Sequence, residues 1–144
     1  MVKSPRIAAL WMMLAFIPIL ACSKNDPAPS SPPIFYQGRV SLENSSGVTI
    51  RLVGFAQMRG QTRVERELDV HLFTGQMYYF LNLIDPNQGH IFAGGDQITV
   101  RYVADEFDPD DPSQPLFQNS VQLTVNGSLV ILVKGGGEYG ISPG

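Results

Sequence analysis

The chain has 144 residues, of which 10 are Lys or Arg and 13 are Asp or Glu, so its formal net charge is −3. Nucleic-acid-binding proteins present a basic face that neutralises phosphates, and this charge balance argues against nucleic acid as a partner. The length suits one domain with a single buried core. Cys22 is the only cysteine, so no disulfide can form within the chain and the fold must depend on its hydrophobic core.

Residues 1–21 have the three regions of a secretory signal peptide. A basic start with Lys3 and Arg6 precedes an apolar run over 7–20, which ends at the small residue Ala21. The apolar run is too short for a comfortable transmembrane span. Without these two basic residues the exported chain has eight basic and thirteen acidic side chains, a net charge of −5. The sequence therefore predicts an exported, acidic protein.

The end of this segment, Ile19-Leu20-Ala21-Cys22, resembles the lipobox of bacterial lipoproteins. The resemblance implies that a peptidase cuts before Cys22, that the thiol carries diacylglycerol, and that in many species the new amino group is acylated too. More than one acyl chain is what stable membrane anchoring requires, at about 0.8 kcal/mol per buried methylene. The alternatives are an ordinary cleaved signal, or an uncleaved helix with a chance cysteine. We expect Cys22 to be lipidated and to attach the protein to a membrane.

A polar, proline-rich run over 23–33 follows the cysteine and reads as a tether, so residues 22–33 are expected to hold the 34–144 domain off the membrane. Ser23 directly after the cysteine resembles the outer-membrane sorting state of proteobacterial lipoproteins. The opening over 23–26 also resembles lipoproteins of Bacteroidetes, some of which face the outside of the cell. These resemblances imply an outer-membrane location in the cell envelope and leave the periplasmic and the surface side open.

From Ile34 onward, apolar and polar residues alternate, which is typical of half-buried strands. The clearest case is 64–72, and turn residues separate the predicted strands. We predict an all-β fold, a small antiparallel β-sandwich of about seven strands. The paired Asn126-Gly127 predicts a tight hairpin between the last two strands, and aromatics on both faces of Tyr78–Phe80 predict a central, buried strand. The predicted strands cover 34–42, 48–56, 64–72, 76–84, 97–104, 120–125 and 128–134.

Four segments of this domain resemble the transthyretin-like, carboxypeptidase-regulatory-like sandwich. They are the Gly-x-Val strand at 38–40, the glycine turn and strand at 46–52, the glycine turn and aromatic strand at 74–80, and the closing strand at 98–102. The likeness covers roughly residues 36–104. It implies an accessory or binding domain, and the family has no shared catalytic residues to place on this chain.

The segment Asp105–Pro112 gathers five carboxylates in eight residues, and carboxylate oxygens are ligands that Ca²⁺ takes. It lacks the glycine and the distal glutamate of an EF-hand loop, and its two prolines restrict how the chain can wrap an ion. We favour a solvated acidic connection between strands and keep a calcium loop over Asp105–Asp111 as the alternative.

Two histidines are the other candidates for chemistry. His71 shares a predicted strand face with Asp69, which is an arrangement that orients an imidazole in catalytic triads. His90 lies in a predicted loop with no second ligand near it in the sequence. One alternating polar strand face explains His71 without chemistry, so we assign no catalytic residue, no cofactor and no metal site.

The exported part carries no catalytic signature, and we expect a non-enzymatic domain that binds a protein or polysaccharide partner at the cell envelope. A structural or accessory subunit of an envelope complex, working through its sheet edges, is the alternative. A calcium-dependent module or a small hydrolase is a more distant one.

Overall fold

The computed structural model describes residues 33–144. The predicted signal peptide, the predicted lipobox with Cys22 and the predicted tether as far as residue 32 lie outside the described residues. Within the described part of the chain, no helix is long and apolar enough to cross a membrane.

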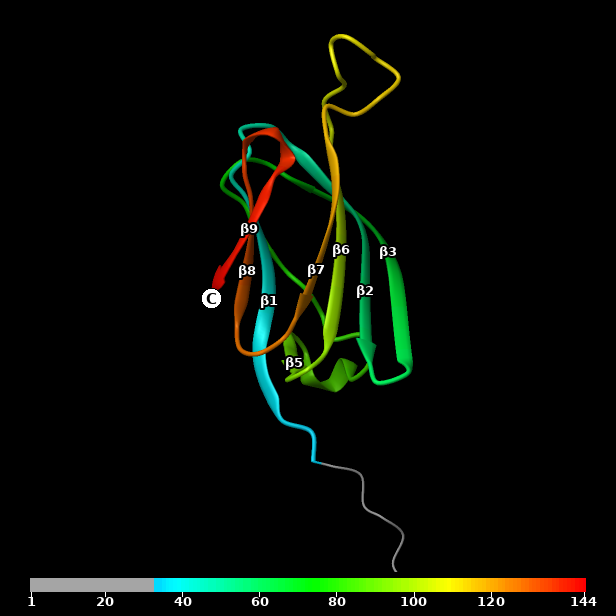
Figure 1. Ribbon diagram of the computed structural model, residues 1–144, viewed down its shortest axis with the longest axis vertical. Coiled ribbons are helices and arrows are strands. Elements are labelled where there is room, and N and C mark those ends of the chain that lie inside the picture. The colour runs from blue at the N-terminus through cyan, green and yellow to red at the C-terminus, as the bar shows by residue number, and fades with distance from the viewer. Residues whose placement is uncertain (1–32) are drawn as a thin grey trace, which may run out of the picture. The chain divides into compact units, whose positions relative to one another are not determined.

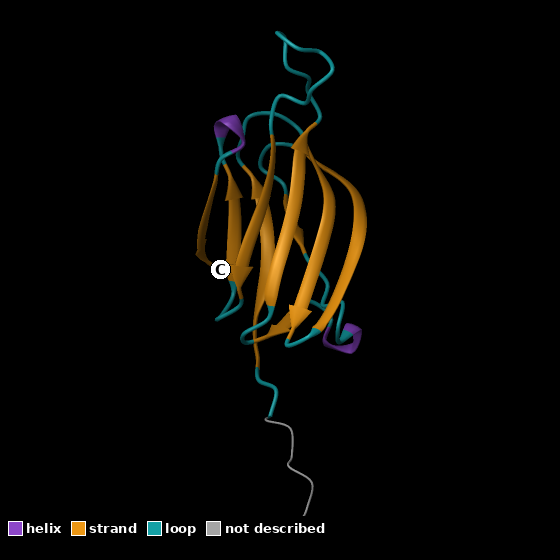
Figure 2. Ribbon diagram, turned by 45° about the vertical axis from the view of Figure 1, so that its right-hand side comes forward, coloured by secondary structure: helices purple, strands orange, loops and turns teal. Residues whose placement is uncertain are grey.

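Two packed sheets form the domain (Figures 1 and 2). In the five-stranded sheet, β1 pairs on one side with β4 and β5 and on the other with β8, which pairs with β9; the four-stranded sheet runs β3-β2-β6-β7. The predicted β-sandwich is confirmed, with more strands than expected and with β1 and β8 parallel. The elements are β1 Tyr36–Asn44, β2 Ile50–Arg59, β3 Thr62–Leu72, β4 Met77–Tyr79, the 3₁₀ turn Pro86–Gln88, β5 Ile91–Ala93, β6 Gln97–Ala104, β7 Gln118–Thr124, β8 Leu129–Val133, the 3₁₀ turn Gly135–Gly137 and β9 Tyr139–Pro143.

Alternation along the strands fills the core. Alternate residues of β1 and β6 face inward, and the buried ones include Val40 and Leu42 of β1 and Ile98, Val100 and Tyr102 of β6. Phe55 stacks on Phe80 with ring centroids 4.7 Å apart and meets the edge of Phe92 at 6.1 Å. Aromatic pairs in such geometries contribute about 0.5–1.5 kcal/mol beyond their buried area. This aromatic cluster joins the two sheets at the centre of the sandwich.

The buried Tyr102 ties the C-terminal segment to the core. Its hydroxyl donates a hydrogen bond to the carbonyl of Gly137, which also accepts one from the Asn119 amide. Burial raises the pKa of Tyr102 to about 12, so the hydroxyl stays a donor at physiological pH. The bond fixes the turn that leads into β9.

The hairpin predicted at Asn126-Gly127 is wrong. β7 belongs to the four-stranded sheet and β8 to the five-stranded sheet, so this turn carries the chain from one sheet to the other. Val125 is buried and exchanges backbone hydrogen bonds with Gly95 and Asp96 beyond the end of β7, which directs the chain across the sandwich. The apolar β8 then fills the inner face of the second sheet instead of extending the polar edge at β7.

Gly38 on β1 permits this crossover. A Cβ atom at this position would lie 2.2 Å from the carbonyl carbon of Gly127 and 2.3 Å from the nitrogen of Ser128. Backbone atoms at such distances cannot be displaced as a flexible side chain can. The Gly-x-Val pattern at 38–40 thus has a steric reason in the fold, since only glycine lets the two backbones pass.

The prediction of a central, buried aromatic strand is also wrong. β4 spans three residues and pairs with β1 alone, at the edge of its sheet. Phe80 is buried, but Tyr79 points outward and is 47% exposed. The strand ends early because the Asn82 side chain accepts hydrogen bonds from the backbone N–H groups of Ile84 and Asp85 and forms a turn.

Candidate functional site

The acidic segment forms the loop between β6 and β7 that projects beyond one end of the sandwich (Figure 1). A bridge between Phe107 and Pro115 closes its base. Asp108 accepts a hydrogen bond from the backbone of Asp110, and Asp111 accepts two from Ser113, which lower the pKa of Asp111. Among residues 33–144, no three His, Cys, Asp or Glu side chains form a group suited to a metal ion. Two of the loop carboxylates instead stabilise its turns.

His71 lies where the loop leaves the four-stranded sheet. Its Nε2 is 3.5 Å from an oxygen of Asp69, as the shared strand face predicted, and its Nδ1 is 2.6 Å from an oxygen of Asp105. Arg51 lies 3.7 Å from Asp105 and 3.8 Å from Asp69. In the described part of the chain, no hydroxyl hydrogen-bonds to this imidazole, and the group forms a surface cluster that includes the ion pairs of Arg51. Sequence reasoning singled out Asp105 only within the acidic segment and missed its contact with His71, since 34 residues separate the two.

His90 has a different setting. Its Nδ1 lies 3.0 Å from the carbonyl oxygen of Phe80, and its ring meets that of Tyr79 edge-on at 6.2 Å. The imidazole therefore packs against the ring of the exposed Tyr79, a contact that the sequence did not indicate.

A buried polar network crosses the opposite end of the sandwich, and sequence reasoning did not predict it. Asp96 is fully buried and receives hydrogen bonds from Gln57 at 2.8 Å and from two nitrogens of Arg59 at 2.7 and 2.9 Å. Gln57 also donates to Asn82 and accepts from the backbone of Leu83. These bonds satisfy the carboxylate within the protein, so we assign the network a structural role.

Arg59 extends this network to the surface. Its guanidinium bonds Asp85 at 2.6 Å, and the Tyr36 hydroxyl donates to the same carboxylate oxygen at 2.7 Å. Hydrogen bonds from Arg59 and Tyr36 lower the pKa of Asp85. The network thereby joins β1, β2 and the turn after β4.

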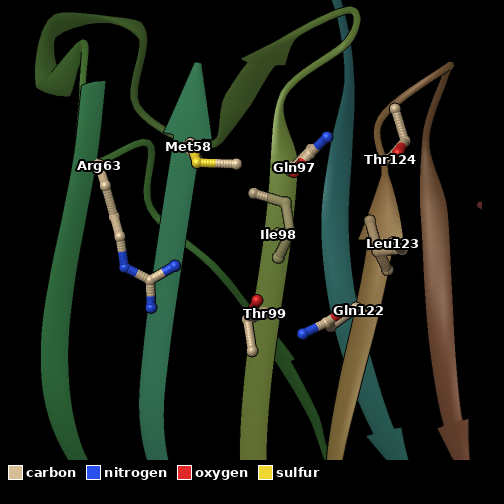
Figure 3. Close-up of a pocket in the computed structure, with 8 residues that line it drawn as sticks. All are labelled: Met58, Arg63, Gln97, Ile98, Thr99, Gln122, Leu123 and Thr124. Carbon is tan, nitrogen blue, oxygen red and sulfur yellow. The ribbon is translucent and has the colours of Figure 1, made fainter. Parts of the chain in front are cut away.

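The outer face of the four-stranded sheet is polar. It carries a shallow depression of about 330 Å³ near the β2–β3 turn, with Gln97 and Thr99 of β6 opposite Thr124 and Gln122 of β7. On the side of the depression away from β7, the Arg63 side chain extends from β3 toward β2 (Figure 3). No aromatic side chain lines this depression. Its chemistry is that of a hydrated strand face.

Elsewhere on this polar face, several charged side chains pair with one another. Arg101 lies over Gly54, where a Cβ atom would come within 2.2 Å of the guanidinium, and reaches Glu65 at 3.1 Å and Glu67 at 3.5 Å. Arg63 pairs with the same Glu65 at 3.2 Å. A partner would have to replace these pairs to bind here.

The outer face of the five-stranded sheet is different, and we call it the Tyr79 face. Ser41 lies at the floor of a depression of about 420 Å³ whose walls include Met77 and Tyr79 on one side and Val130 on the other. Met77 and Tyr79 are 38% and 47% exposed. The Tyr79 face consists of Arg39, Ser41, Glu43, Met77, Tyr79, Ile91, Ser128, Val130 and Leu132.

No protein-family model and no curated protein sequence matches this chain. The outer face of the four-stranded sheet is mostly polar and carries ion pairs, although Val53 and Val103 line a depression of about 420 Å³ on it. The Tyr79 face presents the exposed apolar side chains of Met77, Tyr79 and Ile91.

Proposed function

We propose that this protein is a lipid-anchored lipoprotein of the cell envelope whose sandwich binds a protein partner on the Tyr79 face, without catalysis. The observation that supports the site is the exposure of Met77 and Tyr79 on β4 and of Ile91 on β5, two strands that both pair with β1. Contiguous apolar groups on a soluble surface, bordered by polar residues, mark interaction sites. The resemblance to transthyretin-like accessory domains agrees with this role.

The composition of the face favours a protein partner. Tyrosine and methionine are enriched at protein interfaces, and Arg39 and Glu43 supply a charged border. Binding would bury the apolar atoms and leave these charges to set orientation. An envelope-complex subunit would use the same face in a permanent assembly, so the stoichiometry of the captured complex separates this alternative from a transient binder.

Photo-crosslinking in cells tests the site. A photo-reactive phenylalanine analogue replaces Tyr79 in the full-length protein, and a matched control carries it at Gln122 on the polar face. Illumination should give a discrete protein adduct from position 79 and none from position 122. Adducts from position 122 alone, or from neither position, would contradict the proposed face.

A polysaccharide strand is the second candidate for this face. Sugars stack on aromatic rings and hydrogen-bond to hydroxyls, and the depression sets Tyr79 beside Ser41 and Ser128 with Arg39 at its rim. Envelope glycans added to the purified protein should then quench or shift tyrosine fluorescence in the parent protein and not in Tyr79→Ala. A glycan response together with no protein adduct would replace the first candidate by the second.

A further inference from the structure

The Tyr79 face has a regular pattern of charge and apolarity across its strands. Strand pairing places outward side chains in three rows, each centred on β1. The rows are Ile91, Arg39 and Ser128; then Tyr79, Ser41 and Val130; then Met77, Glu43 and Leu132.

The charges of this face are available to a partner. Arg39 and Glu43 lie one row to either side of Ser41, and within residues 33–144 neither forms an ion pair. On the polar face, by contrast, Arg101 and Glu65 are bonded to each other. A cation and an anion placed symmetrically about one residue make a surface that can pair with itself.

Two-fold symmetry allows two simple ways to lay this face on a copy of itself. An axis along β1 would set Arg39 against Arg39 and Glu43 against Glu43, which is repulsive. An axis across the strands at Ser41 sets Arg39 opposite Glu43 of the other copy, twice. The same operation places Tyr79 against Tyr79, Val130 against Val130 and Met77 against Ile91. Leu132 then lies against Ser128, and charge selects this arrangement over the axis along β1, which would make contacts of similar apolarity.

From these positions we infer that the protein partner of the Tyr79 face is a second copy of this chain, packed face to face with its β1 strands antiparallel. The inference rests on the proposed function, because it names the partner of the same site. The nine residues of β1, at about 3.3 Å each, and the three strand positions of these rows, at about 4.8 Å each, give a face of roughly 400 Å² per copy. A total of roughly 800 Å² is the size of a weak, transient interface, so the dimer dissociates on dilution.

The test uses full-length chains with two different tags, expressed together in cells, and measures how much of one tagged chain the other captures. The parent chains should capture each other. Arg39→Glu should fail to capture Arg39→Glu, since acidic groups then face one another, and Glu43→Arg should fail with itself for the opposite reason. Each loss should be roughly tenfold.

The decisive arm mixes the two variants. Arg39→Glu co-expressed with Glu43→Arg restores both opposite-charge contacts, so this pair should recover capture near the parent level, and the double variant should capture itself. Recovery also shows that each single variant is folded. No self-capture by the parent chain, or a mixture no better than either variant alone, overturns the inference.

The outcome is separable from that of the proposed function. A position-79 adduct with a different protein, together with no self-capture, would leave the Tyr79 face as the binding site and remove the second copy as its occupant. Self-capture that both charge reversals leave unchanged would show association through another surface, and the inference would fall.

Discussion

At the scale of single residues, Asp85 makes the fold sensitive to acid. Hydrogen bonds from Arg59 and Tyr36 hold its pKa below the ordinary 3.8. A carboxyl whose pKa is lowered by folding stabilises the protein above its unfolded pKa, and this contribution is lost as the pH falls through the folded value. The network at this end of the sandwich should therefore weaken at a pH below about 4.

Asp85→Asn tests this linkage. The variant should be less stable than the parent at pH 7, because Arg59 loses a charged partner, and its stability should fall less steeply between about pH 4 and pH 2. Urea unfolding at a series of pH values measures both effects. Asp110→Asn in the exposed loop is the matched control and should follow the parent curve. Parallel pH profiles for parent and Asp85→Asn would show that this carboxylate is not linked to folding.

At the scale of elements, the alternation of apolar and polar residues located most of the strands, but it did not predict which strands pair with each other. The clean pattern at 64–72 lies within β3, which spans Thr62–Leu72, because a half-buried strand imposes a period of two on its own sequence. β5 and β9 were missed, since one has three residues and the other contains glycine and proline. The sheet to which β8 belongs depends on backbone contacts at Gly38, which no local pattern encodes.

Gly38→Ala tests the crossover. The new methyl group would meet the backbone of Gly127 and Ser128, and relieving that overlap should lower the free energy of unfolding by about 3 kcal/mol. Gly140→Ala is the control, because its nearest neighbour is the flexible end of Lys134 at 3.2 Å. Chemical denaturation of both variants gives the comparison. Equal, small losses would mean that the backbone of Gly127 and Ser128 does not pass Gly38 as closely as described.

The acidic loop makes a separate prediction about calcium. Asp108 and Asp111 accept hydrogen bonds from neighbouring residues within the loop and do not gather around one point. The melting temperature of the protein in millimolar Ca²⁺ should therefore agree within about a degree with that in excess chelator, as expected for screening of exposed charges. If the loop did bind Ca²⁺, a calcium concentration of a hundred times the dissociation constant would raise the free energy of unfolding by about 2.7 kcal/mol. A shift of several degrees that Mg²⁺ does not reproduce, and that Asp108→Asn removes, would establish a metal site.

At the scale of the whole molecule, the sequence predicted a sandwich but not which outer face exposes apolar side chains. Tyr79 and Met77 alternate as core residues do, and they are exposed because they lie on the outer face of β4, at a sheet edge that no other element of residues 33–144 covers. Which face of a sheet stays uncovered is a property of the assembled fold. The proposed membrane anchor differs in this respect, because its prediction rests on contiguous residues ending at Cys22.

Cys22→Ala tests the anchor. The change removes the only thiol, so the full-length variant should incorporate no labelled palmitate and should accumulate as an uncut precursor. Ser23→Ala, next to the cysteine, is the control and should be labelled and cut. Palmitate labelling of Cys22→Ala would exclude the lipobox assignment.

Hydroxyl-radical footprinting compares the two outer faces in one experiment. Met77 and Tyr79 lie on the Tyr79 face, whereas Met58 lines the depression on the polar face and serves as an internal reference. Methionine oxidation reports access directly. In intact cells, Met77 and Tyr79 should be oxidised less than in dilute purified protein, while Met58 is oxidised equally in both. Protection of Met58 without protection of Met77 and Tyr79 would contradict the assignment of the binding face.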